Sequence, residues 1–410
     1  MKVGKLLNSL NSFNFILAII VCVSSVTLII VGLNFFDLIN FSKESLVQYD
    51  AELYQKIALN WYTEEYLYAF FPLFPFLWGF FKLSSIGVSF LNFSIYLLSS
   101  ILIFSTFKKV EIHFKVFLIT TPSIIFYIVP YTEGLFFLSS TLIIVGLYYK
   151  KIPLASLGFV LSGLIRPAIT VFIPALLVLF FFKRKRSTLF LIFSSIIGLL
   201  VTVIIQYSAS NEWFIFYSAQ SIWDNSLGLP RLPLRTWSGD FITKIDGYSF
   251  IIGISSGFIV IYDFFSKKFE LKQYEIFSLS YLFGMTLIVL LYREGSLFSL
   301  NRFLLSTPFF WTYLMFFKNR SYLFRKNLNK LLIYTSFIST IIWLGFFYSF
   351  GHIKKFLQFE LISLIIIIQL IYLLSENQYS KKVFYYGVFG INMIFLSIFI
   401  YRYYNGLWIA

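Results

Sequence analysis

The sequence is poor in the residues that bind metals or form disulfide bonds. Among 410 residues there is one cysteine, Cys22, and there are two histidines, His113 and His352. One cysteine excludes an intramolecular disulfide, and the expected topology places the two histidines on opposite sides of a membrane, where they cannot share a zinc ion. The G-x-x-x-x-G-K-[ST] and H-E-x-x-H motifs are also absent. These absences argue against an ATPase and a zinc hydrolase.

Charged residues are scarce as well. They make up 12% of the chain, against roughly 25% in soluble domains, whereas 59% of the residues are hydrophobic. Apolar runs recur throughout, so we predict an all-α polytopic membrane protein in which residues 1–410 form one domain with about 11–13 transmembrane helices. The first run, residues 13–36, is longer than a signal-peptide core and no cleavage site follows it, which predicts a retained first helix.

The net charge of +15 comes from short basic clusters between the apolar runs. By the positive-inside rule, these clusters predict a cytoplasmic N-terminus and argue against nucleic-acid binding. In this orientation most acidic residues are external, and we expect two large external loops, residues 37–85 and 208–248. The first contains an apolar run at residues 68–81 that is too short to span and carries Pro72 and Pro75, so we expect an interfacial or re-entrant element there.

We expect further membrane-crossing helices at residues 88–107, 116–129, 134–149, 154–165, 168–182, 188–207, 249–265, 274–292, 303–317, 331–350, 359–374 and 383–401. The segments 116–149 and 154–182 are short for two full spans, so each predicts a short hairpin whose turn lies below the outer membrane surface. These turns carry Glu133 and Arg166. An ionisable side chain near mid-bilayer costs at least about 2.5–3.5 kcal/mol, which favours a cavity or a charged partner. We therefore predict an external cavity lined by Asp50, Glu133 and Arg166.

Acidic residues cluster in the first external loop of this basic protein, at Asp37, Glu44, Asp50, Glu52, Glu64 and Glu65. Around them the sequence reads Tyr49-Asp50-Ala51, Tyr54-x-x-Ile57-Ala58 and Ala69-Phe70-Phe71-Pro72-Leu73-Phe74-Pro75. This block resembles the start of the PIG-V-like family of polytopic mannosyltransferases, which includes the second mannosyltransferase of GPI-anchor assembly and bacterial relatives. Tyr49 stands where eukaryotic members usually have Trp. The resemblance implies the GT-C glycosyltransferase fold.

Later stretches are similar to the same family. They are Pro122-Ser123 with Phe126, then Tyr131-Thr132-Glu133-Gly134-Leu135-Phe136, then Gly163-Leu164-Ile165-Arg166-Pro167, and finally Asn301-Arg302-Phe303. The surroundings of Gln220 and Trp223 are similar more loosely. The matches are scattered over residues 49–303, and beyond them the sequence offers only hydrophobic spans.

The resemblance implies inverting transfer of a sugar, mannose by family analogy, from a polyprenyl-phosphate donor to a hydroxyl of a lipid-linked or other glycan acceptor at the external face. Such a reaction needs a carboxylate to take the acceptor proton and cations to stabilise the departing phosphate. The resemblance identifies Asp50 as the base. Glu52 would be a second acid or an orienting group, or else a solvated loop residue. Glu133 would orient acceptor hydroxyls or assist Asp50, or else form a structural ion pair with Arg166.

Arginine suits phosphate because its planar donors engage two oxygens. The external candidates are Arg166, Arg231, Arg235, Arg293 and Arg302, of which we favour Arg166 and Arg302. Arg231 and Arg235 lie in a proline-containing turn that either holds a lipid headgroup or caps the next span. Tyr131 and Gln220 complete the predicted substrate-binding set.

Asp50 and Glu52 offer oxygen ligands that Mg²⁺ or Mn²⁺ accepts. The resemblance, however, is to a branch usually thought metal-independent, so we expect no cofactor. Two other functions also fit a polytopic membrane protein. A transporter or lipid flippase would predict pseudo-symmetric halves, whereas the acidic cluster and short hairpins all precede residue 190. A glycan polymerase or ligase would use external arginines but has no need of the Asp50 block.

Overall fold

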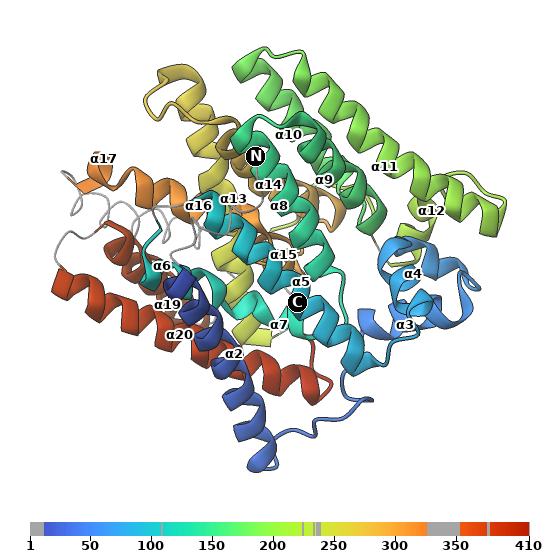
Figure 1. Cartoon of the computed structure of the whole chain (residues 1–410), viewed down its shortest axis with the longest axis horizontal. Helices are drawn as coiled ribbons and strands as arrows, with labels where there is room; N and C mark the ends of the chain where they lie inside the picture. The colour runs from blue at the N-terminus through green and yellow to red at the C-terminus, as the bar shows by residue number, and fades with distance from the viewer. Residues whose placement is uncertain are drawn as a thin grey trace.

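The computed structural model describes residues 12–107, 110–223, 225–232, 234, 239–325, 353–374 and 378–409. All regular elements in these ranges are helices (Figure 1). Six of them are long and apolar enough to cross a membrane, and they are α2 (Ser12–Phe35), α5 (Ser85–Thr106), α11 (Ser187–Ser210), α13 (Gly239–Ser266), α14 (Gln273–Tyr292) and α20 (Gln378–Tyr404). The shortest, α14, has 20 residues and is therefore about 30 Å long, which matches the hydrocarbon thickness. The regular structure of the described residues is thus all helical, and its six long apolar helices indicate a multi-pass membrane protein.

The second predicted short hairpin is present, whereas the first is present only in part, as a sharp bend before α8. Helix α8 (Glu133–Tyr149) follows η2 (Pro122–Ile124) and α7 (Ile125–Ile128), and the two parts of this broken span meet at 111°. Helices α9 (Ile152–Ile165) and α10 (Ile169–Lys183) form the second hairpin and have only 14 and 15 residues. Because these helices are short, the chain reverses within a few residues at Glu133 and at Arg166.

Two predicted spans are wrong because proline interrupts them. Residues 116–129 are not one helix: α6 (Ile112–Ile119) ends before Pro122, and Thr120 is its C-cap. Residues 303–317 are divided between α15 (Leu300–Leu305) and α16 (Pro308–Asn319), which Pro308 starts. Proline lacks an N–H donor and its ring collides with the preceding helical turn, so it is favoured in the first turn of a helix. Pro122 and Pro308 are each the first residue of a helix, whereas Pro174 lies inside α10.

The predicted external loop 208–248 is also wrong in part. It contains α12 (Ile215–Ile222), and α13 begins at Gly239 rather than at residue 249. As a result Asp246, expected in a loop, is buried within a helix. The span predicted at residues 331–350 lies outside the described residues, while α19 (Ile353–Leu374) and α20 contain the last two predicted spans.

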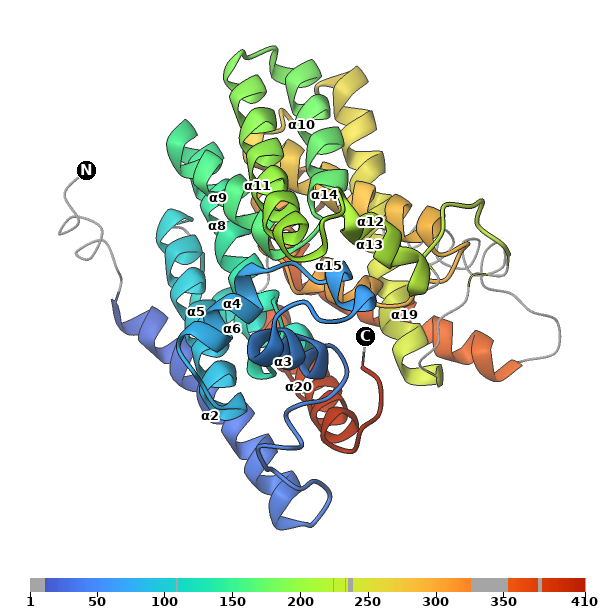
Figure 2. The ribbon, with the colours of Figure 1, turned by 90° about the vertical axis from the view of Figure 1, so that its right-hand side faces the viewer.

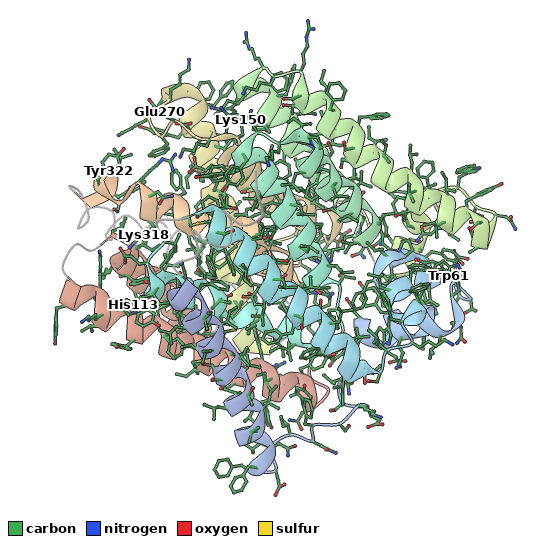
Figure 3. All side chains as sticks on the ribbon, in the orientation of Figure 1. Trp61, His113, Lys150, Glu270, Lys318 and Tyr322 are labelled. Carbon is green, nitrogen blue, oxygen red and sulfur yellow. The ribbon has the colours of Figure 1, made fainter. Side chains whose placement is uncertain are left out.

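The helices that follow α2 cap one end of the molecule. Helix α3 (Asp50–Asn60), η1 (Glu65–Ala69) and the short α4 (Leu73–Phe80) pack together there, with α12 against η1 (Figure 2). Helix α4 has only eight residues, as expected for an element that does not span. Figure 3 shows Trp61 at this end and Lys150 and Lys318 at the opposite end, in line with the predicted separation of the acidic loop from the basic clusters.

Candidate functional site

Asp50 is the first residue of α3, and the residue before it is tightly held. Tyr49 has a positive φ of 55°, which is costly for a residue with a side chain. Its hydroxyl donates to the carbonyl oxygen of Gly406 at 2.5 Å, and its ring meets that of Trp408 edge to face at 4.6 Å. Contacts with the C-terminal segment therefore fix the backbone from which the Asp50 side chain projects.

Arg302 links the two predicted carboxylates. Its Nη1 lies 2.5 Å from Oδ2 of Asp50, and its Nε donates to Oε1 of Glu133. The guanidinium also lies over the Tyr131 ring, 4.3 Å from the ring centroid. Burial alone would lower the pKa of Arg302, but the carboxylates of Glu133 and Asp50 raise it well above its ordinary value. Arg302 is therefore a permanent cation at the centre of the site.

Glu133 is the buried anchor of the cluster. Its Oε1 accepts hydrogen bonds from Arg302 and from Nη2 of Arg166, and Arg166 Nε donates to Oγ1 of Thr132 at 2.8 Å. The Glu133 side chain is fully buried, whereas 21% of the Asp50 side chain is exposed. Of these two carboxylates, Asp50 is the one that a substrate can reach, and Glu133 holds the two guanidinium groups in place.

The turn before Glu133 depends on a close approach of two helices. Nδ2 of Asn92, on α5, donates to the carbonyl oxygens of Phe126 at 3.2 Å and Val129 at 2.9 Å. A Cβ at Gly134 would lie 1.9 Å from Oδ1 of Asn92, so only glycine lets α5 and α8 come this close. This contact fixes the bend that turns Glu133 toward Arg166 and Arg302.

Arg293, just beyond α14, is a third guanidinium at the site, and it has a different environment. Its Nε donates to Oδ1 of Asn225 at 3.1 Å, its Nη1 donates to the carbonyl oxygen of Phe298, and Nδ2 of Asn225 donates to Oε1 of Gln220 at 2.9 Å. Among the described residues, no carboxylate lies within ion-pair distance of Arg293.

Burial lowers the pKa of Arg293 to about 10, and the negative charges of Asp50 and Asp246 oppose this effect only in part. Arg293 thus offers a poorly neutralised positive charge beside Asp50. Such a cation favours an added anion, because its partners are neutral oxygen atoms and its side chain is half-buried.

The cluster therefore brings Asp50, Glu133, Arg166, Arg302 and Tyr131 together, and Gln220 reaches it through Asn225 and Arg293. Other predicted site residues lie apart. Glu52 pairs with Lys56 on the exposed side of α3 at 3.0 Å, and Arg231 pairs with Glu294 at 2.8 Å with 77% of its side chain exposed. Arg235 lies outside the described residues.

Asp50 and Glu52 do not converge on one point, because Asp50 contacts Arg302 while Glu52 contacts Lys56. In the part of the chain that the structure describes, no group of three or more His, Cys, Asp and Glu side chains could hold a metal ion.

Several residues of the site gave no local signal in the sequence. Oδ1 of Asp246 accepts from the backbone N–H of Asn301 at 3.0 Å and so holds the start of α15, which carries Arg302. The C-terminal segment also contributes: the Tyr403 hydroxyl donates to the carbonyl oxygen of Leu46 at 2.9 Å, and Trp408 stacks on Phe298 at 4.9 Å. The sequence pointed to Asp246 only through its position, since it is an acidic residue just before the apolar run at residues 249–265.

Comparison of the chain with protein-family models, with curated proteins and with solved structures gives no match.

Proposed function

We propose that this protein is a membrane glycosyltransferase of the GT-C type. It moves a sugar, mannose in the first instance, from a polyprenyl-phosphate donor to a hydroxyl of a lipid-linked or other glycan acceptor at the external face of the membrane. The observation that carries the proposal is the ion pair of a partly exposed carboxylate, Asp50, with the buried Arg302, beside a half-buried arginine, Arg293, that has no carboxylate partner among the described residues. The residue matches around Asp50, Glu133, Arg166 and Arg302 also support it.

The proposed reaction gives a role to the Asp50 carboxylate and to the Arg293 and Arg302 guanidinium groups. An oxygen of the acceptor attacks the anomeric carbon of the sugar while the bond from that carbon to the phosphate oxygen breaks, with inversion. Asp50 takes the proton of the acceptor hydroxyl, and the polyprenyl phosphate leaves with the electron pair of the broken bond. Arg293 and Arg302 stabilise the negative charge that develops on the departing phosphate.

In the structure Asp50 already has a counter-ion, Arg302. Arg302 contacts Asp50 through Nη1 and Glu133 through Nε. A donor phosphate that binds Arg293 therefore competes with Asp50 for the N–H donors of Arg302. Asp50 then loses a guanidinium partner and its oxygens become free to accept the proton of the acceptor hydroxyl. We therefore expect the donor to bind before the acceptor.

Replacement of Arg293 by Gln tests the phosphate site. A hydrogen bond to a charged group contributes about 1.5–3 kcal/mol, so we expect the KM for the donor to rise about 10- to 150-fold, with a smaller change in the KM for the acceptor. Arg231→Gln is the matched control, because 77% of this arginine's side chain is exposed and its guanidinium already pairs with Glu294. An unchanged donor KM in Arg293→Gln would contradict the assigned role.

Replacement of Trp408 by Ala tests the C-terminal contacts. Trp408 packs on Tyr49, which precedes Asp50, and on Phe298, whose ring lies under Arg293. A small displacement of a catalytic group can reduce the rate about 100-fold, so we expect kcat to fall by this order. Tyr401→Ala changes a partly exposed ring at the end of α20 and should keep the wild-type rate. Equal rates for wild type and Trp408→Ala would contradict the prediction.

The proposed function itself is tested by transfer of radiolabelled sugar. Purified protein is incubated with polyprenyl-phosphate mannose or polyprenyl-phosphate glucose and a membrane lipid extract, and labelled product is separated from the donor. Transfer from one donor identifies the sugar. Absence of transfer from both donors would contradict the proposal and favour a transporter or flippase.

A further inference from the structure

The chain that follows α11 exposes many apolar side chains. It comprises residues 213–232, which contain α12 and the extended stretch after it, and is called the outer apolar segment below. Three of its leucines, Leu227, Leu229 and Leu232, are 70%, 85% and 59% exposed. The other exposed apolar side chains of its described residues are Trp213, Phe214, Tyr217, Ile222 and Trp223. A contiguous apolar surface of this kind marks contact with a protein partner or with a membrane.

The length of α11 sets the height of the first part of this segment. Lys185 and Arg186 precede the helix, which has 24 residues and is about 36 Å long, against a hydrocarbon thickness of about 30 Å. The hydrocarbon therefore ends about 20 residues along the helix, near Tyr207. The ring of Trp213 stacks on that of Tyr207 with 4.2 Å between the centroids. Trp213 thus lies at the outer membrane boundary, where tryptophan and tyrosine are enriched.

The end of α14 sets the height of the second part independently. This helix matches the hydrocarbon thickness, so Leu291, its last residue but one, lies at the outer edge of the hydrocarbon. The backbone N–H of Gly228 donates to the carbonyl oxygen of Leu291 at 2.8 Å. Leu227 and Leu229 flank Gly228 in the sequence, so both exposed leucines are held at the same edge.

Helix α12 has one protein-facing side and one free side. Ile215 and Ala219 are buried against η1, whereas Tyr217 and Ile222 are 63% and 49% exposed (Figure 1). The free side continues a surface of α11 that is also apolar and exposed. The residues of that surface include Leu189, Phe190, Phe193, Leu200 and Ile204. Since α11 spans the membrane, this surface of α11 faces lipid, and the outer apolar segment extends it.

We infer that the outer apolar segment inserts into the outer leaflet of the lipid bilayer. Its leucines enter the edge of the hydrocarbon, and Trp213 lies among the headgroups. Apolar side chains leave water when they insert, and lipid is already present at the height at which α11 and α14 hold them. Arg231 pairs with Glu294 and keeps 77% of its side chain exposed, so its long stem lets the charge stay in the headgroup region.

Insertion has a consequence for Arg293. Asn225 lies in the outer apolar segment, and its Oδ1 accepts from Nε of Arg293 at 3.1 Å. Contact of the segment with lipid therefore holds Arg293 near the depth of the headgroup phosphates, where a polyprenyl-phosphate donor presents its own phosphate. This consequence rests on the proposed sugar transfer, whereas the insertion itself does not.

Spin labelling tests the insertion. Cys22 is the sole cysteine and is buried, so Cys22→Ser gives a background without thiols. In this background Leu229→Cys carries a nitroxide, and the full-length protein is reconstituted in vesicles of phosphatidylethanolamine and phosphatidylglycerol. Collisions of the label with oxygen, which concentrates in hydrocarbon, are compared with collisions with a water-soluble nickel complex. Leu200→Cys, exposed near the middle of α11, is the lipid reference, and Glu52→Cys, exposed on α3, is the water reference.

We expect the ratio of oxygen to nickel collisions at Leu229 to exceed that at Glu52 several-fold and to stay below that at Leu200. Leu227→Cys should give the same result, and it replaces Leu229→Cys if that variant does not fold. A ratio equal to that at Glu52 in both variants would place the segment in water and overturn the inference.

Two further outcomes are informative. Low access of both reagents, with spectral broadening between labels on two copies, would overturn the inference and assign the surface to a second copy of the chain. The collision ratio does not depend on sugar transfer. A protein that transfers no sugar but has inserted leucines would therefore support the insertion and contradict the proposed function alone.

Discussion

Replacement of Asp50 by Asn lowers the rate of sugar transfer by about 100- to 10,000-fold in the reaction proposed here, which is the usual contribution of a general base. The amide cannot take a proton from the acceptor hydroxyl, although it has nearly the shape of the carboxylate. It also keeps one oxygen that can accept from Arg302, so the local arrangement of α3 and α15 should be preserved. The measurement is kcat with saturating donor and acceptor, together with the unfolding temperature in the same detergent.

Glu52→Gln is the control for this result, because Glu52 lies two residues away on the same helix, is 55% exposed and pairs only with Lys56 among the described residues. We expect it to transfer sugar at close to the wild-type rate. If Asp50→Asn were fully active, Asp50 would not be the base. If Asp50→Asn were inactive only because it unfolds at a lower temperature, Asp50 would have a structural role.

Replacement of Glu133 by Gln destabilises the fold by about 3–5 kcal/mol, which is the usual effect of removing one partner from a buried ion pair. Oε1 of Glu133 accepts from both Arg166 and Arg302, and the side chain is fully buried. A neutral amide would leave two guanidinium groups in the interior with Asp50 as the remaining carboxylate in contact with either of them. The measurement is the free energy of unfolding from denaturant titration in detergent.

A double variant separates the charge effect from a general packing defect. Arg166→Gln combined with Glu133→Gln removes one cation with the anion, so we expect the pair to be less destabilised than the sum of the two single variants. Glu270→Gln makes the same chemical change at an exposed position and should leave stability unchanged. Wild-type stability in Glu133→Gln would contradict the role of Glu133 as the anchor of the cluster.

The two predictions distinguish the two carboxylates by their surroundings. Asp50 is partly exposed and has one guanidinium partner, so we expect its replacement to lower the rate of sugar transfer. Glu133 is buried and has two guanidinium partners, Arg166 and Arg302, so we expect its replacement mainly to lower the free energy of unfolding. From the sequence, Asp50 was predicted as the base by the family resemblance, and Glu133 was predicted as an assisting group at a recessed turn. Burial is the property that separates the two carboxylates.

Much of the secondary structure could be predicted from the sequence because it depends on local properties. The apolar runs at residues 13–36, 88–107, 188–207 and 274–292 correspond to α2, α5, α11 and α14, since a membrane helix satisfies its own backbone hydrogen bonds and needs only about 20 apolar residues. The turns at Glu133 and Arg166 were predicted from the length of the apolar runs together with the basic clusters that flank them. The wrong predictions at residues 116–129 and 303–317 came from giving apolar character more weight than Pro122 and Pro308.

The composition of the site was decided by tertiary structure. Asp50 and Arg302 are 252 positions apart, Glu133 and Arg302 are 169 apart, and the hydroxyl of Tyr49 bonds a residue 357 positions away. No local pattern encodes which distant arginine meets which carboxylate, because that pairing depends on how the helices pack. By itself the sequence determined that this is a helical membrane protein, and it predicted ionisable residues at the turns of short hairpins. Only the packing of α3, α8 and α15 decided that Arg302 joins Asp50 to Glu133, since a buried charge is stable only beside an opposite charge that the fold brings to it.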